Sequence, residues 1–148
     1  MEIQKAISKD LKEYLKLKKQ SLKDYSKIRG EKIKYNRNGS IKEFKDHLNF
    51  KKGVILFYNL DNKIAGYLIG NFIENAYQKM SYIDDIFVLG EYRNKGIATL
   101  LIKEFEKITK SKHYPKIRLG VNTKNLSAIE LYNKLGFTTM HYEMEKKV

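Results

Sequence analysis

The 148-residue chain has no cysteine, one proline and no apolar run long enough to cross a membrane. Without cysteine it can form no disulfide scaffold, no zinc site with thiolate ligands and no thiol nucleophile. The first ten residues, MEIQKAISKD, lack the apolar run of a signal peptide. These absences favour a cytoplasmic protein without a membrane partner, and a composition of 42% hydrophobic and 32% charged residues is typical of a folded chain.

Several signatures of ligand-binding proteins are missing as well. His47, His113 and His141 are far apart in the sequence and lack the spacing of metal ligands, so we expect no metal. The pattern GxxxxGK[ST] does not occur, which excludes a P-loop nucleotidase, and neither does the GxGxxG fingerprint of dinucleotide-binding proteins.

The net charge of +13 is distributed unevenly along the chain. Residues 1–52 hold 16 Lys and Arg against 7 Asp and Glu, residues 53–90 hold 2 against 4, and residues 91–148 hold 12 against 6. Most of the cations are lysines at the spacing of helix surfaces, which favours solvated helix faces. A patch that binds nucleic acid or an acidic partner is the alternative.

Hydrophobic periodicity predicts elements in the order β-α-α-β-β-β-α-β-α-β. The strand-helix-strand unit from 81 to 121 requires a parallel pair with a right-handed crossover, and Asp61-Asn62 is typical of a hairpin turn. We therefore expect one α/β domain, 1–148, with a mixed central sheet and helices on both faces. The strands are expected at 2–7, 53–60, 63–73, 81–88, 116–121 and 137–146. Two helices are expected near the N-terminus, one capped by Ser8 or Asp10 and one capped by Ser40. Two more are expected over 96–110, with Ile97, Leu100, Leu101, Phe105 and Ile108 inward, and over 127–135, with Tyr132 on the flank of a buried stripe formed by Ala128, Leu131 and Leu135.

The segment DDIFVLGEYRNKGIATLLIKEFEK, 84–107, combines features of an anion site. A strand with two adjacent acids is followed by the basic turn Arg93-Asn94-Lys95-Gly96 and then by an amphipathic helix. A helix N-terminus offers unpaired N–H groups and a partial positive charge, and a glycine there allows close approach of a ligand. An ordinary strand-to-helix turn is the alternative when this segment is taken by itself.

A second segment makes the first more specific. Asn125 and Tyr132, seven residues apart, are followed by Gly136-Phe137. Together with Arg93-Asn94-Lys95-Gly96-Ile97-Ala98, which matches the pyrophosphate loop [RQ]-x-x-G-x-[GA], this pattern resembles the GNAT superfamily of acetyl-CoA-dependent N-acetyltransferases. The resemblance covers residues 81–137 and is only topological over 1–75. Asn94 stands where the family often has glycine.

The resemblance implies a GNAT fold with a splayed parallel strand pair. It also implies transfer of the acetyl group of acetyl-CoA to a primary amine by direct attack in a ternary complex, where the amine is small, polyamine-like or part of a peptide. Tyr132 would donate a proton to the departing thiolate, and the Val88 N–H would face the thioester carbonyl. The implied acetyl-CoA contacts are Ile86, Phe87, Val88, Arg93, Asn94, Lys95, Gly96, Ile97, Ala98, Thr99, Asn125 and Tyr132.

The two acids remain open to several interpretations. Strand alternation places Asp84 and Asp85 on opposite faces, unless a bulge breaks the alternation. By resemblance to polyamine-type members, Asp84 is the expected base or amine anchor, and Asp85 is a second candidate for binding the substrate. A purely structural role, in which both acids pair with lysines, is the alternative.

Two other function classes remain open. A basic module could use the loop at 93–96 to bind nucleic acid, although Asn125 and Tyr132 would then have no role. A GNAT fold could also bind a CoA ester without catalysis. A homodimer is compatible with the 11 tyrosines of the chain and with the habit of the family.

Overall fold

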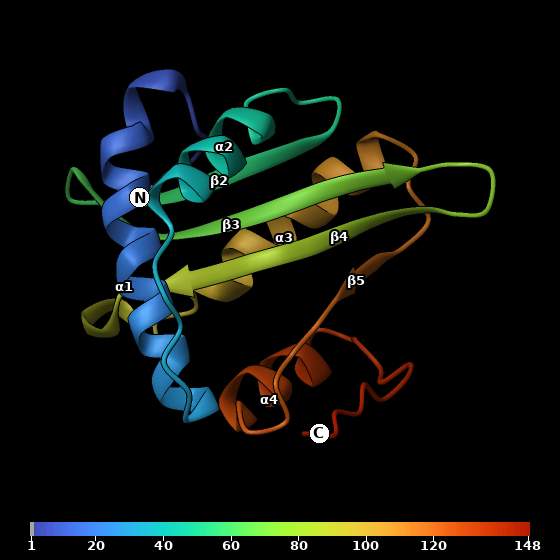
Figure 1. Cartoon of the computed structure of the whole chain (residues 1–148). Helices are drawn as coiled ribbons and strands as arrows, with labels where there is room; N and C mark the ends of the chain where they lie inside the picture. The colour runs from blue at the N-terminus through green and yellow to red at the C-terminus, as the bar shows by residue number, and fades with distance from the viewer. Residues whose placement is uncertain (1) are drawn as a thin grey trace.

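The computed structural model describes residues 2–148, which form a five-stranded sheet in the order β1-β2-β3-β4-β5 with helices on both faces. Figure 1 shows the strands and the helices that cross them. The strands are β1 (Glu2–Lys5), β2 (Gly53–Leu60), β3 (Lys63–Glu74), β4 (Lys79–Val88) and β5 (Ile117–Leu119); the helices are α1 (Leu11–Arg29), α2 (Arg37–His47), α3 (Ile97–Ser111) and α4 (Leu126–Lys134), with short 3-10 turns at Ser8–Asp10 and Gly90–Tyr92.

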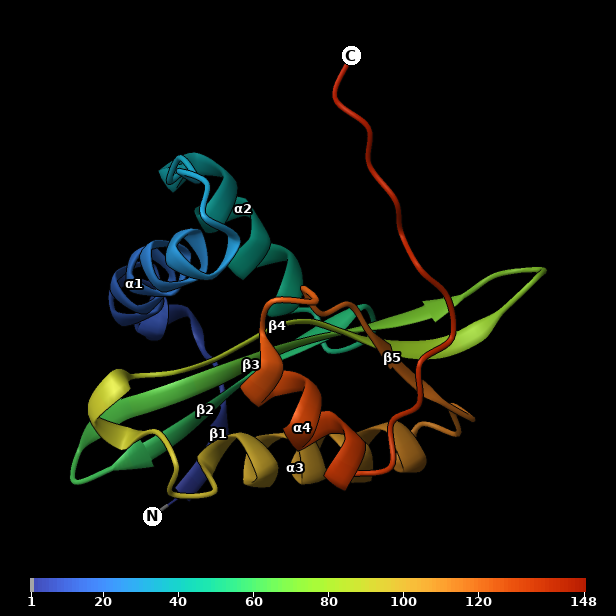
Figure 2. The same cartoon turned by 90° about the horizontal axis from the view of Figure 1, so that it is seen from below.

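The sheet separates two hydrophobic cores. Figure 2 shows α1 and α2 on one face and α3 and α4 on the other. The core under α1 and α2 is built around Tyr14, Phe44 and Tyr67, whereas the core under α3 is built around Leu68 and Phe105. Because β2 and β3 are covered on both faces, their central stretches, 54–58 and 64–70, contain no charged or amide side chain, as expected for central strands.

The sheet is mixed, as the sequence predicts. Strands β1 to β4 pair in antiparallel fashion, and the predicted turn at Asp61-Asn62 joins β2 to β3 with both residues at positive φ, 51° and 61°. Strand β5 pairs with β4 in parallel, but only over Ser81–Ile83 against Ile117–Leu119. Beyond Ile83 the last five residues of β4 pair with no described strand on that side, so the parallel pair opens.

Two local predictions are wrong. The α2 helix does not begin at a Ser40 cap: it begins earlier, because the Asn36 side chain accepts a hydrogen bond from the Gly39 N–H at 2.9 Å and caps the helix. In α3 the inward residue is Ile102 rather than Leu100, which is 44% exposed. Leu100 lies at the margin of the apolar stripe, where a small rotation of the helix decides which side chain is covered.

The predicted last strand, 137–146, is also wrong. No described residue after Lys134 lies in a helix or strand, and Figure 2 shows the C-terminal segment leaving the body beside β5. The alternation of this segment satisfies the pattern of a strand, but a strand also needs a neighbour for its backbone groups, and it pairs with no strand within residues 2–148.

None of the helices within residues 2–148 is long and apolar enough to cross a membrane. The cytoplasmic location stays a prediction from the sequence.

Candidate active site

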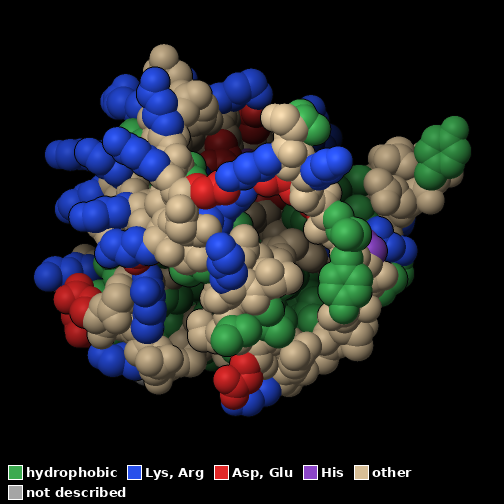
Figure 3. Space-filling model, turned by 60° about the horizontal axis from the view of Figure 1, so that its bottom comes forward, with side chains coloured by type: hydrophobic (Ala, Val, Ile, Leu, Met, Phe, Trp, Pro, Cys, Tyr) green, Lys and Arg blue, Asp and Glu red, His purple; other side chains and the backbone are tan. Residues whose placement is uncertain are grey.

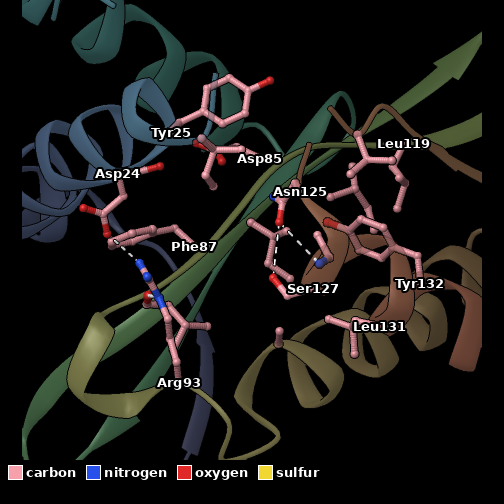
Figure 4. A pocket seen from close by; sticks show the side chains of 18 of the residues that line it. Asp24, Tyr25, Asp85, Phe87, Arg93, Leu119, Asn125, Ser127, Leu131 and Tyr132 are labelled. Carbon is pink, nitrogen blue, oxygen red and sulfur yellow. Dashed lines mark hydrogen bonds and ion pairs between the residues drawn. The ribbon is translucent and has the colours of Figure 1, made fainter. Parts of the chain in front are cut away.

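A cavity of about 770 Å³ opens where β4 and β5 diverge. Its volume lies within the range of about 300–1,000 Å³ that is typical of small-molecule sites. Residues from α1, β4, the N-terminus of α3, the end of β5 and α4 line it, and Figure 4 shows side chains from these elements pointing into one space. All the acetyl-CoA contacts implied by the sequence lie in this lining except Lys95, and Asp84 and Asp85 lie there too.

The backbone of β4 presents free amide groups to this cavity. The Leu89 N–H donates to the carbonyl oxygen of Ala65, in the neighbouring strand β3, at 2.9 Å. Because alternate N–H groups of a strand point to opposite edges, the amides of Val88 and Ile86 point to the other edge, where β5 has diverged. Both are therefore available to an extended ligand lying between the strands.

The turn before α3 forms a concave set of N–H groups. Asn94 and Gly96 both have left-handed backbone conformations, with φ of 60° and 77°. The first helical hydrogen bond runs from the Leu100 N–H to the Gly96 carbonyl oxygen, so the amides of residues 97–99 have no partner within the helix. Such a turn at a helix N-terminus is suited to an anion.

The two basic side chains of this turn are placed differently from what the sequence suggests. The Arg93 guanidinium donates to the Val88 carbonyl oxygen and forms an ion pair with Asp24 of α1 (Figure 4). Lys95 lies outside the cavity lining, with its ammonium 5.4 Å from the centre of the Tyr92 ring. The arginine therefore anchors the turn to β4 and α1, and the groups of the turn that remain available to a ligand are mainly its backbone amides.

Helix α4 brings Asn125 and Tyr132 to the opposite wall. Asn125 caps the helix: its Oδ1 accepts from the Ala128 N–H at 3.3 Å, which leaves its Nδ2 donor without a partner among the described residues. The sequence predicts Tyr132 on the flank of a buried stripe, but it is the most buried residue of α4, at 8% exposure. Burial, and next the nearby Asp85 carboxylate, raise the pKa of the Tyr132 hydroxyl to about 12.

A β-bulge changes the expected placement of the two acids. The register between β3 and β4 shifts where Ile69 pairs with Asp85 and Gly70 pairs with Ile83, so Asp84 is the extra residue of the bulge. Asp85 reaches Lys18 of α1, and Asp84 accepts a hydrogen bond from Asn71. Asp84 and Asp85 therefore lie on the same side of the sheet, facing α1 and α2, and the prediction of opposite faces is wrong.

Lys18 is a central member of this site, although the sequence motifs do not point to it. Its side chain is only 12% exposed and its ammonium contacts Asp85 at 2.8 Å and Glu43 at 3.1 Å. Burial lowers the pKa of Lys18, but the two carboxylates more than offset this and raise it overall. A signal was available, because Lys18 falls four residues after Tyr14 and four before Leu22, within the apolar stripe of the first helix.

Asp84 is the remaining free carboxylate of the group. Asp85 is neutralised by Lys18, whereas Asp84 forms no ion pair with any residue in 2–148. Partial desolvation raises the pKa of Asp84 above its ordinary value. A carboxylate with a raised pKa at the edge of a cavity is suited to binding an ammonium group or accepting its proton.

Sequence comparisons connect this geometry to known proteins. The model of the Acetyltransferase (GNAT) family matches residues 17–137. The mouse thialysine N-epsilon-acetyltransferase is 34% identical over 74 residues, which cover 49% of this chain and 44% of the relative. An N-alpha-acetyltransferase of Saccharolobus solfataricus is 35% identical over 104 residues, which cover 64% of this chain and 62% of the relative. The chain thus spans about half the length of the curated relatives it matches.

Solved structures share the fold over the whole chain. A tetramutant of the BH1408 protein of Bacillus halodurans superposes with a TM-score of 0.88 at 24% identity, covering 100% of both chains. AAC(6')-Iy in complex with the bisubstrate analogue CoA-S-monomethyl-acetylneamine superposes with a TM-score of 0.81 at 14% identity, covering 99% of this chain and 97% of the other. At these identities the structures establish a common fold.

Proposed function

Because the chain belongs to the GNAT acetyltransferase family, we propose that it is an N-acetyltransferase that moves the acetyl group of acetyl-CoA to a primary amine by direct attack in a ternary complex. The observation that carries the proposal is the open parallel pair, whose cavity is lined both by the turn residues Asn94 and Gly96 and by Tyr132. A nucleic-acid module would leave the buried tyrosine without a role.

The groups that line the cavity support acetyl-CoA as the acetyl donor. The concave turn and the free amides of residues 97–99 would hold the pyrophosphate, and the pantetheine arm would lie between β4 and β5 against the amides of Ile86 and Val88. The Asn125 Nδ2 donor would bond the same arm. The bound ester would present its thioester carbonyl to the Val88 N–H, which stabilises the negative charge that develops on that oxygen.

The acceptor amine must first lose a proton, since a lysine-like ammonium has a pKa near 10.4. Asp84 would bind the ammonium and accept this proton directly or through a water molecule. As the nitrogen attacks the carbonyl carbon, the C–N bond forms and the C–S bond breaks. Tyr132 gives its proton to the departing thiolate, and the second proton of the nitrogen restores the tyrosine through solvent, so one proton is released per turnover.

The charges around the acceptor end favour an amine with a single ammonium group. Three carboxylates, Asp84, Asp85 and Glu43, lie near one another, but Lys18 pairs with the last two. Figure 3 shows Lys and Arg side chains crowding the side of the molecule formed by α1. A polycation would therefore place its other ammonium groups near a positive rim, with only one free carboxylate to bind them. A peptide or small monoamine would need only that one carboxylate for its single ammonium group.

We expect kcat/KM for a monoamine, such as the side chain of a lysine peptide, to exceed that for spermine by about tenfold, which corresponds to about 1.4 kcal/mol. A panel of amines with acetyl-CoA, followed by release of the free thiol, measures this. The matched variant is Lys18→Met, which frees Asp85 and Glu43 and should raise kcat/KM for spermine relative to the monoamine. Acetyl-CoA binding without thiol release for any amine would instead indicate a CoA-ester-binding protein without catalysis.

A further inference from the structure

A second cavity, of about 540 Å³, lies beside the candidate active site at the C-terminal end of α2. It is lined by the last turns of α2, by the turn that leads into β2 and by Asn71 of β3. Asn71 donates a hydrogen bond to Asp84, which lines the larger cavity. The two cavities therefore meet at this hydrogen bond, and an acceptor amine held by Asp84 would have the second cavity next to it.

The second cavity is positively charged. Three lysines and one aspartate line it, which gives a net charge of +2 without His47. Lys42 is neutralised by Asp46, whose carboxylate lies 2.5 Å from its ammonium. Lys45 and Lys52 are exposed and form no ion pair with any residue in 2–148. The cavity therefore holds two ammonium groups that no described carboxylate pairs with.

The turn that carries Lys52 has a fixed backbone whose amides are already paired. The N–H groups of Lys52 and Gly53 donate to the Asn49 carbonyl oxygen. The Lys51 N–H donates to the Asn49 side chain, and the Lys52 carbonyl oxygen accepts from the Phe72 N–H of β3 at 2.9 Å. Phosphate sites commonly use several free backbone amides, whereas in this turn only side chains can bind an anion. The cavity is therefore better suited to a carboxylate than to a phosphate group.

His47 lies at the junction of the two cavities. Its Nδ1 lies 2.7 Å from the Glu43 carbonyl oxygen, and its Nε2 is buried without a hydrogen-bond partner among the described residues. A Cβ built on Gly53 would lie 2.6 Å from the Cδ2 of this ring and 3.0 Å from the Asn71 Oδ1, so the ring and the amide are neighbours. Desolvation raises the pKa of Asp84, and the next largest effect, that of His47, lowers it. The ring is therefore close enough to both cavities to report a ligand that bridges them.

We propose that Lys45 and Lys52 form a subsite for a carboxylate of the acceptor, so that the substrate is an amine that also carries a carboxylate. This inference rests on the proposed function, because it requires an acceptor amine at Asp84. The adjacent cavities present opposite charges, a free carboxylate in one and two free ammonium groups in the other, and this arrangement complements a zwitterion. A diamine of the same length would bring its second ammonium against the lysines.

The test compares unbranched ω-amino acids of increasing chain length, each with its own carboxamide, which keeps the length and removes the negative charge. With acetyl-CoA as donor and thiol release as the signal, we expect kcat/KM for the acid to exceed that for the amide by about fivefold or more at the length that spans both cavities. The double variant Lys45→Gln, Lys52→Gln should bring this ratio to about one. Its matched control, Lys12→Gln, Lys19→Gln, removes the same charge from exposed positions of α1 that line neither cavity, and should keep the preference.

Binding is measured separately from turnover, by the NMR signals of the His47 ring and the Asn71 side-chain amide during titration with the same acids and amides in the presence of CoA. We expect the acids to shift these signals at lower concentrations than the amides. Acetylation of acid and amide with equal kcat/KM at every length would contradict the carboxylate subsite and leave the proposed function standing. If no amine releases thiol, the proposed function fails, and the titration then decides the subsite: equal shifts by acid and amide contradict it.

Discussion

Replacement of Tyr132 by phenylalanine should lower kcat by about 100-fold or more, the usual contribution of a positioned acid. The change removes one hydroxyl and keeps the ring, which packs against Phe137 with 5.8 Å between ring centres. Folding and acetyl-CoA affinity should therefore stay close to those of the unchanged protein. The thiolate would have to leave without a proton, and this loss should appear in kcat while the acetyl-CoA dissociation constant is unchanged.

The pH dependence separates this role from simple packing. The acid form of Tyr132 is present below its pKa and lost above it, and burial with the Asp85 charge raises that pKa to about 12. The rate of the unchanged enzyme should therefore show no decline from this group up to about pH 11, whereas an ordinary tyrosine with a pKa near 10 would lose its proton there. A Tyr132→Phe variant with unchanged kcat would mean that another group supplies the proton.

Substitution of Asp84 should lower the activity, whereas substitution of Asp85 should lower the stability. Asp84→Asn keeps the hydrogen-bonding shape of the bulge but removes the free carboxylate, and it should lower kcat/KM by about 100-fold at pH 7 with little change in stability. Asp85→Asn removes the partner of a lysine that is 12% exposed and of the Tyr67 hydroxyl. This change should lower the free energy of unfolding by about 2–3 kcal/mol.

Steady-state rates measure the effect on kcat/KM, and urea unfolding measures the effect on stability, for both variants. The pH profile adds a check on Asp84, because its base form is present above its pKa and lost below it. Partial desolvation raises that pKa, so kcat/KM should begin to fall, as the pH is lowered, at a higher pH than an ordinary aspartate would give. Unchanged turnover in Asp84→Asn would remove its chemical role, and a large loss of stability would make that role structural.

Local patterns predicted the parts of the molecule that local chemistry determines. The turn at residues 93–96 needs left-handed backbone, a free helix N-terminus and a following apolar stripe, and all three are encoded within a few residues. The hairpin at Asp61-Asn62 is encoded in the same way. The resemblance of two motifs then allowed the family and the mixed fold to be predicted, and both are confirmed.

Three features that the sequence did not predict depend on distant partners. The bulge at Asp84 arises from pairing with β3, so alternation along β4 alone gives the wrong face. The importance of Lys18 comes from Asp85 and Glu43, which lie 67 and 25 residues away in the sequence. The segment 137–146 has the periodicity of a strand, but periodicity does not determine which strand it pairs with. Among the described residues it pairs with no strand.

The direct test of the central claim is calorimetric titration of the chain with acetyl-CoA, together with a matched pair of glycine variants. Gly96 and Gly30 have similar left-handed backbones, with φ of 77° and 72°, and an added Cβ would meet nothing within 4 Å at either position. The backbone strain of Gly96→Ala and Gly30→Ala should therefore be alike, but only Gly96 lies in the cavity lining.

We expect one acetyl-CoA to bind per chain with a dissociation constant in roughly the micromolar range. Gly96→Ala should weaken binding by about tenfold or more, because its methyl group would occupy the approach of the pyrophosphate to the backbone. Gly30→Ala should bind like the unchanged chain. If the unchanged chain takes up no acetyl-CoA at concentrations of about 1 mM, or if both variants bind alike, the cavity between β4 and β5 is not an acetyl-CoA site.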